Sequence, residues 1–389
     1  MADDRASPDI GEADADRAAA SGDVAGARHI LEQVTASGPA RSDTWLKLAA
    51  MCRSQGDVDG ALDAVGGALR VDPLGFLPLL LKANLLDAAG RAGEAGETYG
   101  HALAQRPEVI PPGLSAAVDL AERRHSEHVQ AASARLAAAL APLADGLSDE
   151  EAARARRFNS NILRSTRPFH SEPSHFHYPG LSEREFHDRS AFPWLSSLEA
   201  ATPHILEDFQ RVMAAERAEL VPYIDYPDDV PLRQWVALNR SRDWTAIHLV
   251  RNGTRVEANA RHCPAVMELL GELDQPQVAG RSPNAMFSLL APGAHIPPHN
   301  GVANTRLVCH LPLIVPPGCW FRVGAERRDW RVGEAWLFDD TIEHEARNES
   351  DALRVILIVD TWHPGLSPAE RRAVAASMEA SGADAGEGL

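Results

Sequence analysis

The stretch SLLAPGAHIPPHNGVANTRLVCHLPLIVPPGCWFRVGAERRDWRVGEAWLFDDTIEHEARNESDALRVILIVDTWHP, residues 288–364, decides how the second half of this chain folds. It consists of short apolar runs separated by glycine, proline and asparagine, which is typical of an all-β domain. Two histidines, His299 and His344, stand among these runs beside acidic or small polar residues. Because imidazole is the commonest metal ligand in proteins, the stretch predicts a metal held inside a β-barrel and therefore an enzyme.

The pattern of short apolar runs begins earlier, after Val221. The strands that it predicts are Trp244–Arg251, Ala285–Ala291, Arg306–Val315, Cys319–Val323, Ala335–Phe338 and Leu353–Thr361. Two helical segments, Leu195–Ala218 and Cys263–Leu270, are expected to pack outside them. Many short strands with turn signals between them indicate a sandwich or barrel, and a double-stranded β-helix, one form of jelly roll, is the simplest closure.

Alternation along two of these strands places charged groups inside the domain. Arg306, Val308 and His310 share one strand face, and Arg354 shares a face with the apolar residues that follow it at every second position. If these faces line the barrel, Arg354 is a buried cation, which needs an anionic partner. No acidic residue lies within four positions of Arg354 on this strand face, so the partner is either a ligand carboxylate or an acid elsewhere in the fold.

The first third of the chain contains a repeat of 34 residues. Its three registers are Gly22, Gly56 and Gly90; Pro39, Pro73 and Pro107; and Ala27, Ala61 and Ala95. The repeat unit predicts a helix, a glycine turn, a second helix and a proline stop, with small alanines where the helices cross. It resembles the tetratricopeptide repeat, whose stacked helix pairs form a solenoid with a concave face suited to peptides. A spacer or dimerisation arm without a ligand is the alternative.

These patterns divide the chain into segments. We expect a disordered tail over 1–8, repeats over 9–108, a helical cap or linker over 109–158, a jelly-roll domain over 159–375 and a disordered tail over 376–389. The fold class is therefore a multidomain α and β protein, with an N-terminal α-helical tetratricopeptide-like solenoid followed by a double-stranded β-helix, which is cupin-like.

Composition excludes several classes of function. The formal net charge is −17, so a nucleic-acid footprint is not expected. The four cysteines form no CxxC pair and fit a reducing compartment. The acidic start of the chain lacks the apolar core of a signal peptide, and no apolar run is long enough to span a membrane. We therefore expect a cytoplasmic protein without a membrane partner.

Several motifs between Tyr178 and Arg372 resemble the aspartyl/asparaginyl β-hydroxylase family of iron(II)- and 2-oxoglutarate-dependent dioxygenases. They are YPGLSEREFHDRSAFPWL, HxG at His299, HL at His310, GCWFRVG, FDDTIEHE, LRVILIVDTWHP and ERR, and they occur in the family's order. The resemblance covers about half of the chain. It implies Fe(II) as the metal and 2-oxoglutarate and O2 as cosubstrates.

The resemblance also assigns roles to single residues. It implies that His299 and His344 are the iron ligands, and that Gly301 stands where the wider superfamily has a third, carboxylate ligand. The acids Asp339 and Asp340 lie close to His344 in sequence, and one of them is expected to orient a ligand or a metal-bound water; Asp340 is the one assigned to the site.

The cosubstrate site is assigned in the same way. Arg354 and Ser288 resemble the residues that bind the distal carboxylate of 2-oxoglutarate, and Trp244 and His310 match further positions at that site. The family commonly has a second arginine where this chain has Val308. Arg306, two residues upstream, is the remaining cation that is expected to contact the substrate carboxylate or to compensate in part.

The family implies that the substrate is an Asp or Asn residue of a peptide or protein, hydroxylated at Cβ and presented by the repeat domain. Two alternatives stay open. One is hydroxylation of a lipid or small-molecule acyl chain, and the other is a non-catalytic repeat scaffold with a degenerate barrel, which the loss of the arginine at Val308 favours.

Overall fold

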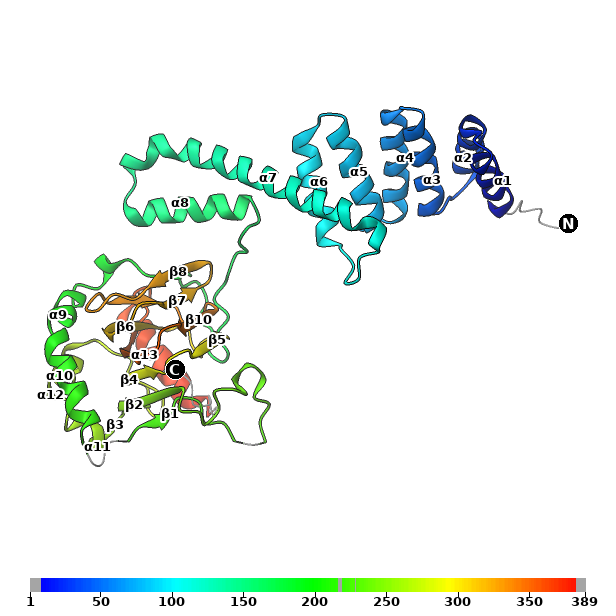
Figure 1. Ribbon diagram of the computed structural model, residues 1–389. Helices are drawn as coiled ribbons and strands as arrows, with labels where there is room; N and C mark the ends of the chain where they lie inside the picture. Colours follow the sequence, from blue (N-terminus) through cyan, green and yellow to red (C-terminus); the bar gives the residue numbers. More distant parts are fainter. Residues whose placement is uncertain (1–7, 216–218, 228, 383–389) are drawn as a thin grey trace. The chain divides into compact units, whose positions relative to one another are not determined.

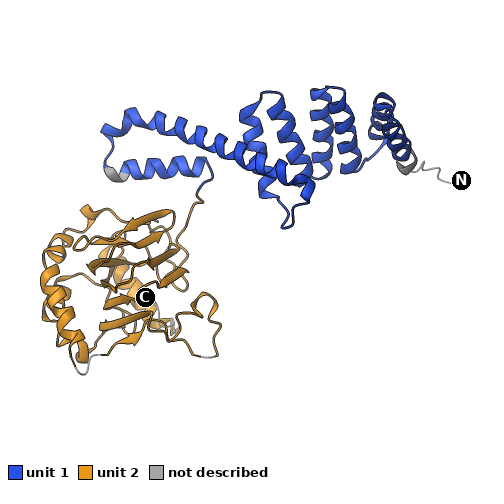
Figure 2. Cartoon of the chain, viewed as in Figure 1, with its two compact units in different colours: residues 1–165 blue, residues 166–389 orange. Residues whose placement is uncertain are grey.

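The computed structural model describes residues 8–215, 219–227 and 229–382, and the chain divides into two compact units, Met1–Ser165 and Thr166–Leu389 (Figure 1, Figure 2). The division follows shortly after position 159, where the composition of the sequence changes. Of the residues expected to form disordered tails, 1–7 and 383–389 lie outside the described residues. The expectation is wrong for residues 376–380, which form the last part of a helix. No helix in the described ranges is long and apolar enough to cross a membrane.

The first unit consists of helix pairs joined by tight turns. The pairs are α1 (Pro8–Ala20) with α2 (Val24–Ser37), α3 (Ser42–Ser54) with α4 (Val58–Val71), and α5 (Phe76–Ala88) with α6 (Ala92–Ala104). The repeat glycines Gly22, Gly56 and Gly90 end the first helix of each pair at φ of 86°, 75° and 75°, a left-handed conformation that glycine adopts without strain. The repeat alanines are at most 1% exposed. The predicted tetratricopeptide-like solenoid is confirmed.

Two longer elements follow the repeats. After η1 (Pro112–Leu114), α7 (Ser115–Leu140) packs on the solenoid through Val118 and Ala121, both buried. The turn η2 (Ala141–Gly146) leads to α8 (Asp149–Ile162), which begins at a capping box formed by Ser148 and Glu151. The helical character expected up to Phe158 therefore continues to Ile162.

The second unit contains two antiparallel sheets. The larger has the strand order β1-β2-β4-β11-β6-β9, with β3 paired to β2. Its strands are β1 (Val221–Pro222), β2 (Trp244–Arg251), β3 (Thr254–Arg255), β4 (Ala285–Leu290), β6 (Arg306–Ile314), β9 (Trp336–Phe338) and β11 (Arg354–Trp362). The smaller has the order β5-β10-β7-β8, from β5 (His295–His299), β7 (Cys319–Val323), β8 (Glu326–Asp329) and β10 (His344–Asn348).

The two sheets pack face to face, which confirms the predicted fold class. One buried cluster joins Met286, Val308 and Ile358 of the larger sheet to Ile296 and Phe321 of the smaller. No strand ladder links the sheets within the described ranges, so the barrel is an open sandwich rather than a closed one.

Helices cover the outer face of the larger sheet. The segment predicted as one helix over Leu195–Ala218 forms two, α9 (Leu195–Ala200) and α10 (Thr202–Met213), and α11 (Glu257–Ala260) and α12 (Pro264–Glu272) follow later. Pro203 sits in the first turn of α10, where its missing N–H does no harm. The remaining elements are η3 (Arg189–Ala191), η4 (Arg233–Trp235) and α13 (Pro368–Ala380).

The pattern of apolar runs in the sequence did not predict the two strands that carry His299 and His344. Residues 295–299 read HIPPH and lie outside every predicted strand, but they form β5 at the edge of the smaller sheet. Proline is tolerated there because an edge strand has one side without ladder hydrogen bonds. Residues 344–348 form β10, although their charged residues interrupt the apolar pattern. Pairing with β5 and β7 on both sides holds this strand in place.

Candidate active site

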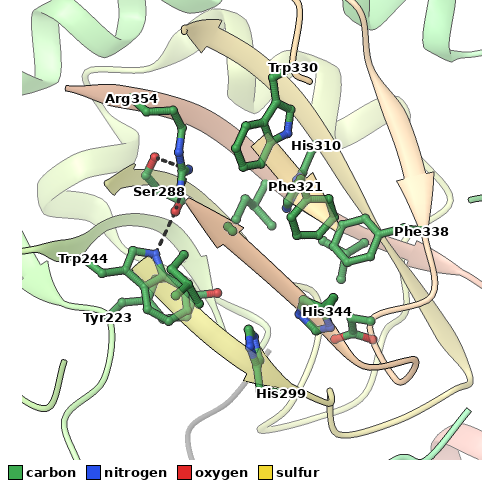
Figure 3. Close-up of a pocket in the computed structure, with 15 residues that line it drawn as sticks. Tyr223, Trp244, Ser288, His299, His310, Phe321, Trp330, Phe338, His344 and Arg354 are labelled. Atoms are coloured by element: carbon green, nitrogen blue, oxygen red, sulfur yellow. Dashed lines mark hydrogen bonds between the residues drawn. The ribbon is translucent and has the colours of Figure 1, made fainter. Parts of the chain in front are cut away.

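A cavity of about 60 Å³ lies between the two sheets (Figure 3). Its lining residues are Tyr223, Trp244, Ser288, Ile296, His299, Val308, His310, Phe321, Trp330, Phe338, Asp340, His344, Ala346, Arg354 and Ile358. Every residue that the sequence assigned to the metal or cosubstrate site lines it except Arg306, and Gly301, the position without a third ligand, does not line it either. Tyr223, Phe321, Trp330 and Phe338 were missed, because an aromatic residue in a strand pattern predicts core and says nothing of a cavity.

The two histidines face each other across neighbouring strands. His299 at the end of β5 is paired in register with His344 at the start of β10, and their ring centroids lie 4.0 Å apart. Nδ1 of His299 donates to the carbonyl of Pro297 (2.7 Å), and Nδ1 of His344 donates to the carbonyl of Ile342 (3.1 Å). A carbonyl can only accept, so these bonds fix the tautomer and leave a lone pair on each Nε2.

Both rings are neutral at physiological pH. Burial lowers the pKa of His299 well below its ordinary value, and the nearby His344 adds to this effect. Burial also lowers the pKa of His344 to about 4. Neutral imidazole is the form that binds a metal ion, so the pair offers two ready ligands. No group of three His, Cys, Asp or Glu side chains suited to a metal occurs within the described part of the chain.

The carboxylate of Asp340 fills the space beside Gly301, the position at which the resemblance implies that no third ligand is present. A Cβ added at Gly301 would overlap the carboxylate of Asp340, and the backbone N–H of Gly301 donates to the Asp340 carbonyl (2.6 Å). Nη2 of Arg306 donates to Oδ2 of Asp340 (3.0 Å), while Oδ1 is buried without a partner. Arg306 therefore lies behind Asp340 and outside the cavity lining. Its side chain is only 7% exposed.

We expect the substitution Gly301→Asp to fail to create a three-ligand site. Its Cβ overlaps a carboxylate that Arg306 holds in place, so overpacking and a second buried acid should destabilise the fold by roughly 2–5 kcal/mol. Urea unfolding and metal titration measure both effects. The double variant Gly301→Asp, Asp340→Ala removes the overlap and should recover most of the stability. A single variant that is as stable as the parent and binds metal more tightly would contradict this geometry.

The other end of the cavity holds a buried cation. Arg354 is 2% exposed, and no carboxylate in the described ranges forms an ion pair with it. Its Nη1 donates to the carbonyl and to Oγ of Ser288 (3.4 and 3.3 Å), and its Nε has no partner. The sequence analysis left two possible partners for Arg354, an internal acid and a ligand anion. The described residues provide no internal acid, so a ligand anion remains.

The hydroxyl of Ser288, beside this arginine, is free to donate a hydrogen bond to a ligand in the cavity. Its Oγ accepts from Nε1 of Trp244 (3.0 Å), a bond drawn as a dashed line in Figure 3, and also from Nη1 of Arg354 (3.3 Å). These two bonds occupy both lone pairs of the hydroxyl, so its own O–H is left for a ligand. Trp244 is in turn held by Tyr223, whose ring stacks on it with centroids 3.7 Å apart.

His310, on β6 beside the strand of Arg354, completes the polar lining. Burial lowers its pKa well below the ordinary value, and the positive charge of Arg354 acts in the same direction. Its Nδ1 is buried without a partner, and its ring is packed between Phe321 and Phe338, with centroids 5.0 and 4.7 Å away. A neutral histidine with an unpaired nitrogen is a further polar group for a ligand.

Buried neutral histidines outside the cavity make stability depend on pH. Burial lowers the pKa of His187 to about 3 and that of His248 to about 4. The unfolded chain titrates near 6.5, so below that pH it binds more protons than the folded chain. We expect the free energy of unfolding to fall from pH 6.5 to 4, by about 2 kcal/mol for each such histidine at pH 5.

Denaturant unfolding at pH 7.5 and pH 5 measures this loss. The substitution His248→Gln should reduce the difference between the two pH values, because glutamine does not titrate. Burial raises the pKa of Asp339 to about 7, which acts in the opposite direction, so the comparison with His248→Gln is the decisive one. A difference between the two pH values that His248→Gln leaves unchanged would contradict the burial of a neutral ring at His248.

Comparisons with known proteins point to one family. A family model described as Aspartyl/Asparaginyl beta-hydroxylase matches residues 199–364, which include every candidate site residue. The human aspartyl/asparaginyl beta-hydroxylase is 31% identical over 205 residues, which are 51% of this chain and 27% of that protein. The chain thus spans about a quarter of the length of this relative.

A bacterial relative is matched over more of its length. The ornithine lipid ester-linked acyl 2-hydroxylase of Rhizobium tropici is 32% identical over 202 residues, which are 51% of this chain and 68% of that protein. Among solved structures, the TPR domain of OM64 from Arabidopsis is similar to 31% of this chain and 95% of its own, with 16% identity and a TM-score of 0.27.

Proposed function

The chain belongs to the aspartyl/asparaginyl β-hydroxylase family, and from this premise we propose that it is an iron(II)- and 2-oxoglutarate-dependent dioxygenase that hydroxylates Cβ of Asp or Asn residues in a peptide or protein. One observation carries the proposal. A single cavity has two neutral imidazoles at one end and a buried guanidinium without an acidic partner at the other.

The residues present fit a bound iron(II) ion. His299 and His344 would hold it through Nε2, since their Nδ1 atoms are already bonded to backbone carbonyls. Iron, when bound, supplies the activation of O2 that places oxygen on a C–H bond. The unpaired Oδ1 of Asp340 would accept a hydrogen bond from water near the metal, and Arg306 keeps that carboxylate in position.

The residues also fit a dicarboxylate. Unpaired donors gather around the inner end of the cavity: Nε of Arg354 and the O–H of Ser288, with the unpaired Nδ1 of His310 close by. Arginine binds a carboxylate through two parallel N–H bonds, so the distal carboxylate of 2-oxoglutarate suits this end. The 2-oxo acid group would then point toward the histidine pair.

The remaining residues exclude water and position the substrate. Apolar side chains such as Ile296, Phe321 and Phe338 line the middle of the cavity, so charges within it are poorly screened. In the proposed reaction, 2-oxoglutarate, O2 and a C–H substrate give succinate, CO2 and the hydroxylated product. One oxygen atom enters succinate and the other enters the product. The repeat unit would present the peptide.

Hydroxylation of an acyl chain is the second candidate. It is favoured by the bacterial relative, an acyl 2-hydroxylase matched over 68% of its length, and by Val308. The resemblance implies an arginine at that position, and the isopropyl group found there suits an apolar substrate better than a charged one.

A substrate panel separates the two candidates. The protein with iron(II), 2-oxoglutarate and O2 is incubated with Asp- and Asn-containing peptides and, separately, with acyl lipids, and products are examined by mass spectrometry. The proposal expects a gain of one oxygen on Asp or Asn, absent in the His344→Ala variant. Oxygen gained only on an acyl chain would replace the peptide proposal by the second candidate.

A further inference from the structure

Trp330 is a buried tryptophan at the inner end of the cavity. It follows β8, is 4% exposed and lines the cavity beside Arg354 and His310 (Figure 3). The guanidinium carbon of Arg354 lies over its ring, 5.0 Å from the centroid. Its indole N–H is buried without a partner.

The charge of Arg354 needs compensation even before a ligand arrives. A fully buried guanidinium without an acid is strongly destabilised by loss of water, and burial lowers the pKa of Arg354 to about 9. The hydrogen bonds from Nη1 to Ser288 offset part of this. The face of an indole ring is the other favourable environment for a cation, and Trp330 supplies it.

Two contacts from opposite sheets therefore fix the guanidinium. Ser288 on β4 holds one edge through Nη1, and Trp330, which follows the outer strand of the smaller sheet, covers a face. The Nε of Arg354 remains without a hydrogen-bond partner. An arginine fixed in this way keeps its fork ready for a carboxylate and loses little freedom when the ligand binds.

Trp330 is itself held in place by other rings. It stacks on Phe321 with centroids 5.4 Å apart and planes at 24°, and on Trp336 with centroids 6.4 Å apart and planes at 12°. Packing against two nearly parallel rings restricts the orientation of the Trp330 side chain, so its ring can hold the guanidinium that lies over it in one orientation.

We propose that Trp330 is a positioning residue for the anion site: its ring holds Arg354 in the orientation that recognises the distal carboxylate of the cosubstrate. The inference rests on the proposed function and deepens it, because it makes recognition of a dicarboxylate depend on a contact between the two sheets.

The test is anaerobic calorimetric titration of the full chain loaded with iron(II), using two ligands. One is 2-oxoglutarate, and the other is 2-oxobutyrate, which has the same 2-oxo acid group without the distal carboxylate. Trp330→Leu is expected to weaken 2-oxoglutarate binding roughly 10- to 30-fold and to leave 2-oxobutyrate within about twofold. Trp330→Phe keeps an aromatic face and should recover most of the affinity.

Trp320→Leu is the matched control. Trp320 lies on β7 outside the cavity lining, carries Arg327 over its ring at 4.5 Å and also has a buried indole N–H without a partner. The substitution Trp320→Leu removes a similar arginine–tryptophan contact from the same sheet. Because this contact lies outside the cavity lining, the affinities for both ligands should stay unchanged.

The outcomes are distinct. Trp330→Leu binding 2-oxoglutarate as tightly as the parent, or losing both ligands equally, would overturn the role of Trp330 and leave the proposed function standing. A parent protein that binds neither ligand would remove the proposed function and this inference together. The Trp330→Phe variant distinguishes loss of the contact with Arg354 from loss of folding, because its ring can still stack on Phe321.

Discussion

Replacing His344 with alanine is expected to abolish high-affinity iron(II) binding. Among the described residues no third His, Cys, Asp or Glu joins His299 and His344 in a group that could hold a metal, so removing one of them leaves a single imidazole. Metal affinity should therefore fall at least 100-fold. Hydroxylation should be lost with it. Equilibrium dialysis under argon, with metal content measured afterwards, gives the affinity directly.

His295→Ala is the matched control for this prediction. His295 lies on the same strand as His299, but its Nε2 pairs with Glu345 (2.9 Å) and it does not line the cavity. Iron binding should survive this substitution. If His344→Ala retained the parent's affinity, or if His295→Ala lost it, the assignment of the two ligands would be wrong.

Replacing Arg354 with leucine is expected to weaken 2-oxoglutarate binding at least 100-fold. The distal carboxylate would then be buried without its cation, which typically costs about 3–5 kcal/mol. The folded protein itself should be no less stable, because the substitution removes a buried charge that has no acidic partner. Calorimetry measures the first effect and thermal unfolding the second.

Arg354→Lys sharpens this prediction. Lysine keeps the charge but lacks the planar fork, so affinity should be intermediate between the parent and Arg354→Leu. Unaltered 2-oxoglutarate binding in Arg354→Leu would show that the carboxylate site lies elsewhere. A marked loss of stability in that variant would mean that the arginine is structural.

The sequence predicted the fold class because its signals are local. Glycine turns and buried alanines at a fixed period specify the helix pairs, and strands such as Trp244–Arg251 and Cys319–Val323 were predicted with the bounds that the structure has. The strands β5 and β10 were missed because prolines in one and charged residues in the other hide the alternation. Their stability comes from pairing with each other, which sequence patterns do not record.

The same reasoning explains what was missed at the site. Strand alternation indicated that Arg354 and His310 face inward, and both line the cavity. The pairing of Arg306 with Asp340 was not predictable, because it joins residues 34 positions apart whose approach depends on the absence of a side chain at Gly301. Trp330 was missed because its contact with Arg354 connects two sheets.

The most direct test of the account is whether iron(II) and 2-oxoglutarate bind to the same cavity. If the metal lies at the histidine pair and the cosubstrate spans from it to Arg354, each must raise the affinity of the other by the same factor. Anaerobic titration of 2-oxoglutarate into the metal-free and the iron-loaded protein measures that factor. We predict at least tenfold tighter binding with iron, and no such gain in His344→Ala. Equal affinity with and without iron would contradict a shared site.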